Sequence, residues 1–149
     1  MHPFDIKSAL LAKHAQHVVL IHFPIALLII GVLFDLLAQW TKNRALAMAA
    51  YCNLIAAAIS TIPALLSGLL AWQWVLDGHK LKGILLYHVV FAYAAAALIW
   101  VVAAVQFRYR QAPDTSLPLL RLPIEILTVA VVALTGHLGG FLSGVNLPS

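Results

Sequence analysis

Charged side chains are scarce in this chain. Only 9% of its 149 residues are Asp, Glu, Lys or Arg, whereas a soluble domain carries about 25%. Hydrophobic residues make up 63%. A soluble fold with so few charges does not have enough polar side chains to cover its own surface, so lipid has to cover it. The composition therefore predicts an integral membrane protein.

Cysteine is also scarce, and the basic residues are not clustered. Cys52 is the only cysteine, so the chain can form no internal disulfide and has no C-x-x-C-H motif for covalent haem attachment. The formal net charge is +4, but the nine Lys and Arg residues lie in ones and twos between apolar runs, without a basic stripe. We therefore expect no nucleic-acid partner, and any haem would be held by side-chain ligation alone.

Four apolar runs are each long enough to cross the hydrocarbon core of a bilayer, which takes roughly 20 helical residues. They cover about residues 18–40, 46–72, 83–106 and 119–142. The connections between them are short, which makes successive spans antiparallel neighbours. The sequence therefore predicts an all-α integral membrane four-helix bundle, running up-down-up-down, in which residues 1–149 form a single transmembrane domain.

The spans divide the basic residues between two sides of the membrane. Side A holds both termini and the connection at 75–82, and side B holds the other two connections. Side A carries Lys7, Lys13, Lys80 and Lys82, and side B carries Lys42, Arg44, Arg108, Arg110 and Arg121. Cytoplasmic loops are enriched in Lys and Arg. The difference of one residue favours side B as cytoplasmic and the termini as periplasmic.

Three histidines lie within the apolar runs, where an ionisable group is costly and indicates a function. Following the chain through the bundle places His22, His88 and His137 within about 6–9 Å of the side A interface, at 1.5 Å per helical residue. Three different helices thus carry an imidazole at one depth. His17, which precedes His22 by about one and a half turns, lies near the same depth.

Neutral imidazole is the commonest metal ligand among side chains. Two histidines on facing helices can hold a b-type haem that moves electrons, and three or four at one level can hold zinc or copper. Alternatively, each histidine only hydrogen-bonds a neighbouring helix and no cofactor is bound. We predict haem b, with His88 as the first axial ligand, His22 or His137 as the second, and His17 as a further candidate.

Acidic side chains near side B have a simpler interpretation. Asp35 lies near the end of the first span, and Glu125 lies near the start of the fourth. Arg121 precedes Glu125 by four residues, a spacing that favours an ion pair on a helix. We expect both carboxylates to reach the interface or to pair with Arg121, Lys42 or Arg44, in a structural role.

Several short strings resemble one bacterial membrane family. Residues 17–27 read HVVLIHFPIAL, residues 62–68 read IPALLSG, and residues 136–140 read GHLGG, with His88 between the last two. In order and spacing, these strings resemble the family catalogued as domain of unknown function 2231, across about residues 17–145. Val18 stands where that family usually has a proline after the first histidine, which weakens the assignment of a shared role to His17.

The resemblance implies a four-helix protein of the bacterial inner membrane. Related domains are joined to c-type cytochrome modules, which favours electron transfer. The hypothesis is therefore a b-type cytochrome-like subunit of a respiratory or photosynthetic membrane complex, with a c-type cytochrome as a possible partner and lipid around it. The alternatives are an accessory subunit without a cofactor, or a small membrane site for a metal ion or a quinone.

Overall fold

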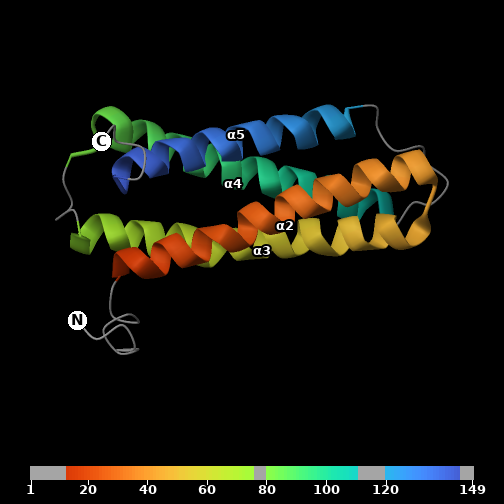
Figure 1. Ribbon diagram of the computed structural model, residues 1–149, viewed down its shortest axis with the longest axis horizontal. Helices are drawn as coiled ribbons and strands as arrows, with labels where there is room; N and C mark the ends of the chain where they lie inside the picture. The colour runs from red at the N-terminus through yellow and green to blue at the C-terminus, as the bar shows by residue number, and fades with distance from the viewer. Residues whose placement is uncertain (1–12, 76–79, 111–119, 145–149) are drawn as a thin grey trace.

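The computed structural model describes residues 13–75, 80–110 and 120–144. In these residues the chain forms four helices, α2 (Lys13–Thr41), α3 (Arg44–Val75), α4 (Gly83–Arg110) and α5 (Arg121–Leu142), shown in Figure 1. Each helix contains a stretch apolar and long enough to cross a membrane, at Gln16–Thr41, Arg44–Gln73, Gly83–Arg108 and Arg121–Leu142. This confirms the predicted all-α four-helix membrane fold. The connections after Val75 and Arg110 lie largely outside the described residues.

A two-residue turn joins α2 to α3 and makes them antiparallel. Lys42 has a φ of 55°, a left-handed conformation that ends α2. The side-chain oxygen of Asn43 then accepts the backbone N–H of Ala45 at 2.8 Å, which supplies one of the acceptors that the start of a helix needs. The short connection expected at this point of the sequence thus consists of a residue that ends one helix and a residue that caps the next.

The bundle consists of two helical hairpins. Helix α2 packs along α3, and α4 packs along α5, whereas contacts between the two hairpins are fewer (Figure 1). Between the hairpins, Trp100 Nε1 of α4 donates to Thr61 Oγ1 of α3 at 3.1 Å. The buried apolar core lies around the middle of the bundle and contains residues from all four helices: Leu28, Val32, Leu54, Ala57, Ala58, Ala95, Ile99, Val102, Ala103 and Val132.

The core does not continue to the side A end of the α4/α5 hairpin. No residue in 83–94 of α4 or in 133–144 of α5 is buried. In Figure 1 the two hairpins diverge toward this end, where α2 begins and α5 ends. The hairpins are therefore packed together in the middle and toward side B, and are less closely associated near side A.

Candidate functional site

His88 contacts the neighbouring helix of its own hairpin. Its Nδ1 lies 3.1 Å from the backbone carbonyl oxygen of Thr135 in α5. A carbonyl oxygen only accepts, so Nδ1 must carry the hydrogen and Nε2 then carries the lone pair. Thr135 is in the interior of α5, where its carbonyl already accepts a hydrogen bond of the helix. The contact therefore orients the imidazole and does not serve to satisfy an otherwise unpaired carbonyl.

A glycine makes room for the His88 ring. A Cβ atom added at Gly139 of α5 would lie 3.2 Å from His88 Cε1 and 3.6 Å from Nδ1. The first of these distances is shorter than ordinary van der Waals contact between carbon atoms. A Cβ at position 139 would therefore require the His88 ring to move by a few tenths of an ångström.

His17 has the same arrangement in the other hairpin. Its Nδ1 lies 3.0 Å from Ser67 Oγ of α3. The Ser67 hydroxyl donates its own hydrogen to the Ala64 carbonyl at 2.8 Å, so it accepts from His17 and leaves the lone pair on Nε2. A Cβ added at Gly68 would lie 3.0 Å from His17 Cε1. We call the His17–Gly68 and His88–Gly139 contacts the two imidazole seats.

The other two predicted histidines are exposed on their helices. His22 Nδ1 lies 2.5 Å from the carbonyl oxygen of Val18, one turn earlier in the same helix. The His137 ring meets the ring of Phe141 edge-on, with centroids 5.0 Å apart and planes at 82°. The structure thus places His17 and His88 against a partner helix, whereas the contacts described for His22 and His137 are to their own helix.

No group of three His, Cys, Asp or Glu side chains that could hold a metal ion occurs in the part of the chain that the structure describes. The residues predicted to share a zinc or copper ion are therefore not brought together as a set of three. Near side A, each hairpin instead has one imidazole that is oriented by a contact with the neighbouring helix.

A second polar group, the side B cluster, lies between α2, α4 and α5. Arg121 forms ion pairs with Asp35 through Nη2 and with Glu125 through Nε, the latter at 3.4 Å. Gln106 Nε2 donates to Glu125 Oε1 at 3.0 Å and to Asp35 Oδ1 at 3.4 Å, and Gln39 Nε2 donates to Asp35 Oδ2 at 2.8 Å. The cluster therefore joins both hairpins through charged side chains.

The side B cluster confirms one expectation and corrects another. Asp35 and Glu125 both pair with Arg121, one of the three expected partners, but neither carboxylate reaches the interface, because both residues are 0% exposed. Arg121 is 6% exposed, so it is not a charge flanking the membrane. Without it, sides A and B carry four basic residues each, and the positive-inside rule no longer favours either orientation.

The imidazole seats and the side B cluster lie on the same inner faces. Eighteen residues, about five helical turns, separate His17 from Asp35, His88 from Gln106, and Gly139 from Arg121. Eighteen residues also correspond to about 27 Å along a helix. The two groups therefore lie at opposite ends of the inward faces of α2, α4 and α5, and the residues between them on these faces are mostly apolar. Counting whole helical turns from Asp35 toward side A would have selected His17 over His22 from the sequence.

Comparison with known proteins agrees with this architecture. Residues 13–145 match the family described as "Predicted membrane protein (DUF2231)". The chain belongs to this family. The matched range contains both imidazole seats and the whole side B cluster, and it confirms the family resemblance of the strings at 17–27, 62–68 and 136–140. No curated protein and no solved structure matches the chain.

Proposed function

We propose that the side A end of the bundle binds one b-type haem, which His88 of α4 and His17 of α2 would hold, and that the protein transfers electrons in the bacterial inner membrane. The observation that carries the proposal is the hydrogen bond from His88 Nδ1 to the Thr135 carbonyl. Metal-bound histidines almost always donate their other ring nitrogen to a carbonyl or carboxylate in this way.

The ligand set fits a haem better than it fits other metal sites. A six-coordinate b-type haem needs two imidazoles from facing helices and no cysteine attachment. His88 and His17 belong to different hairpins, and the Nδ1 of each ring contacts an oxygen of its partner helix, so Nε2 would be the nitrogen that binds the iron. Zinc needs three or four ligands, and the described residues do not bring three together.

The surroundings of the two rings support the same assignment. Ala92 follows His88 one turn later on its helix face, so the face next to His88 presents little bulk to a planar group, whereas Ala95 and Ala96 further along are buried. The hairpins are less closely packed at this end, since residues 83–94 and 133–144 include no buried residue. Cofactor sites of helical bundles are built from side chains on facing helices.

Some residues of the site would bind the haem iron, and others would orient the histidines that do so. His88 and His17 would bind the iron, while Thr135 and Ser67 would hold the two rings in orientation and make the imidazoles more basic. A bis-histidine haem supplies one-electron transfer, with a potential set by its ligands and by burial. The electron partner, such as a c-type cytochrome or another subunit of a membrane redox complex, would approach at side A.

Absorption spectroscopy of the purified protein tests this proposal. The protein is produced in a bacterial host with sufficient haem and purified in detergent. The expected result is a Soret band and a sharp α band on reduction, with one haem per chain by extraction. A colourless protein from haem-replete cells overturns the proposal. Metal and quinone analysis of that sample then separates a different cofactor from a subunit that binds none.

Four histidine variants test the choice of ligands. His88→Ala and His17→Ala are expected to lose the six-coordinate spectrum, because each removes one axial ligand. His22→Ala and His137→Ala are matched controls at a similar depth and are expected to keep it, because both residues are exposed. Loss of the spectrum in a control variant, with retention in His17→Ala, would refute the pairing of His17 with His88.

A further inference from the structure

Glu125 has one carboxylate oxygen without a partner in a fully buried position. Among the residues that the structure describes, no hydrogen-bond donor reaches Glu125 Oε2, and the residue is 0% exposed. The other oxygen, Oε1, accepts from Gln106 and Arg121. A buried polar atom with no partner is strongly disfavoured, and more so when it is charged. An additional group is therefore expected at Oε2.

The charges of the side B cluster point to the same atom. Among the described side chains, two carboxylates face one guanidinium, which leaves one negative charge uncompensated if every group is ionised. Asp35 accepts donors on both oxygens, from Arg121, Gln106 and Gln39, so its charge is satisfied. Gln106 is neutral, and the one charged residue of α3, Arg44, is exposed at the first position of that helix. The uncompensated charge therefore belongs to Glu125.

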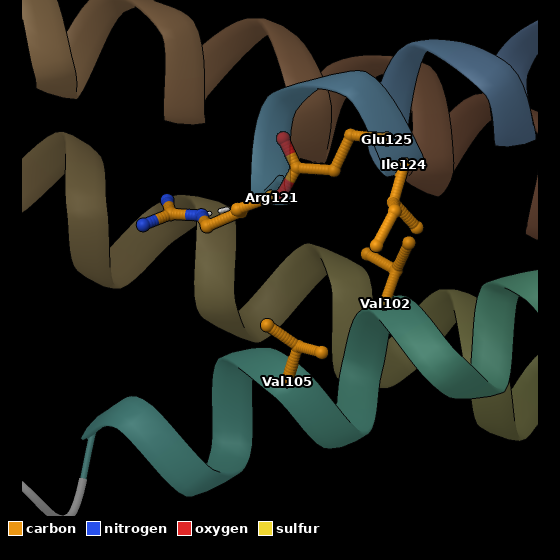
Figure 2. Close-up of a pocket in the computed structure, with 5 residues that line it drawn as sticks. All are labelled: Val102, Val105, Arg121, Ile124 and Glu125. Carbon is orange, nitrogen blue, oxygen red and sulfur yellow. Dashed lines mark hydrogen bonds and ion pairs between the residues drawn. The ribbon is translucent and has the colours of Figure 1, made fainter. Parts of the chain in front are cut away.

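The side chains around Glu125 fit a bound proton better than a bound metal ion. Glu125 lines a pocket of about 10 Å³ together with Val102, Val105, Arg121 and Ile124 (Figure 2). In Figure 2 one carboxylate oxygen of Glu125 faces Arg121 and the other points away from it. A calcium or magnesium ion needs several oxygen ligands, whereas three of the lining side chains are aliphatic and a fourth is cationic. A proton needs only the oxygen atom itself.

We propose that Glu125 Oε2 is a reversible proton-binding site that exchanges with the side B interface. An O–H bond forms at Oε2 as an O–H bond of a hydronium ion breaks and leaves water, which gives a neutral carboxylic acid and removes the excess negative charge. The reverse step returns the proton to water. Glu125 lies four residues after the start of α5, about 6 Å from the helix end, so the exchange path is short.

Selective labelling gives a direct test, because Glu125 is the only glutamate in the chain. Glutamate carrying carbon-13 in its side-chain carboxyl labels this residue alone. The full-length protein is reconstituted in lipid nanodiscs, and infrared and carbon-13 NMR spectra are recorded from acidic to alkaline pH. The expected result is reversible interconversion of the labelled acid and carboxylate signals while far-ultraviolet circular dichroism stays constant. A labelled carboxyl that stays ionised wherever the helices are folded overturns the proposal, as does titration that coincides with unfolding.

A reference variant distinguishes a buried proton site from a solvated carboxyl. The double variant Lys42→Glu with Glu125→Gln carries its only glutamate at an exposed position between α2 and α3. The acid carbonyl of Glu125 is expected to stretch at a higher frequency than this reference, because its pocket has aliphatic walls and the reference is hydrogen-bonded to water. Equal frequencies would show that Glu125 titrates in water and would refute the buried site. Neither result depends on haem binding.

Discussion

Removing the positive charge of the side B cluster should destabilise the fold more than removing a negative one. In the Arg121→Met variant, Asp35 and Glu125 are left in a buried position with no cation. Breaking a buried ion pair in this way costs about 3–5 kcal/mol, because it leaves uncompensated charge in a low-dielectric interior. In the Asp35→Asn variant, Arg121 still pairs with Glu125 at 3.4 Å, and the ionised groups that remain sum to zero.

The loss for Asp35→Asn is correspondingly smaller. The amide introduced at position 35 would keep an acceptor for Gln39 or Gln106 but would lose the charge-assisted bond to Arg121, and hydrogen bonds to charged groups contribute about 1.5–3 kcal/mol. The expected order of the free energy of unfolding, from highest to lowest, is therefore wild type, then Asp35→Asn, then Arg121→Met. The difference between the two variants in free energy of unfolding is large because both carboxylates are 0% exposed. Exposed ion pairs contribute only about 0–1 kcal/mol.

Reversible unfolding by sodium dodecyl sulfate in mixed micelles, followed by far-ultraviolet circular dichroism, measures this order. Arg108→Met is the matched control, because Arg108 is an exposed arginine on α4 near the same side. We expect it to change the free energy of unfolding by no more than about 0.5 kcal/mol. An Asp35→Asn variant that is as destabilised as Arg121→Met would refute the charge count on which this prediction and the proton site both rest.

Two glycine substitutions test the close packing of helices, each against Gly136→Ala, where an added Cβ meets nothing within 4 Å. Gly139→Ala places a Cβ 3.2 Å from His88 Cε1, so we expect a changed nitrogen-15 shift of the His88 ring and lower stability than Gly136→Ala. Gly31→Ala places a Cβ 2.8 Å from the fully buried Leu54 side chain, and overpacking of this kind costs about 1–3 kcal/mol. Replacing a helical glycine by alanine itself gains about 1 kcal/mol in helix propensity. Gly136→Ala has the same gain, so the comparison with it removes this contribution. Stabilities equal to that of Gly136→Ala would contradict the packing described.

The helices themselves were predictable, because the length of an apolar run is enough to define a membrane span. The predicted runs at 18–40 and 83–106 lie within α2 and α4, and the helices extend a few residues beyond them. The extensions include polar and basic residues such as Gln16 and Arg108, which hydropathy excludes. Such residues continue a helix into the interface, where long side chains reach water.

The inward face of each helix was not predictable from hydropathy. A helix of a soluble protein shows its buried side by its apolar stripe, but a helix in lipid is apolar all round. The choice between His17 and His22 therefore had no hydropathic signal, and the valine at position 18 pointed away from His17. Asp35 supplies the missing signal, because a carboxylate in a span must face protein, and His17 lies about five turns away on that face.

The hydrogen-bond partners could not be predicted without knowing how the hairpins pack together. Nothing in the sequence near His88 indicates that its ring lies against Gly139 and the carbonyl of Thr135, which follows forty-seven residues later in the chain. The same holds for the burial of Arg121 against Asp35. Spacing predicted the pairing of Arg121 with Glu125 within one helix, but the partner on another helix depends on how α2 and α5 meet.

The two ends of the bundle should function independently, because the residues between them are apolar or already hydrogen-bonded. In the described part of the chain, the buried polar residues between the imidazole seats and the side B cluster are Thr61 and Thr128, and each hydroxyl donates to a carbonyl of its own helix. A proton bound at Glu125 therefore has no polar route to side A. Accordingly, Glu125→Gln should leave the haem content unchanged, and His88→Ala should leave the titration of labelled Glu125 unchanged. A shift of the Glu125 titration in the His88→Ala protein would show that the apolar middle transmits a structural change, and would refute the independence of the two ends.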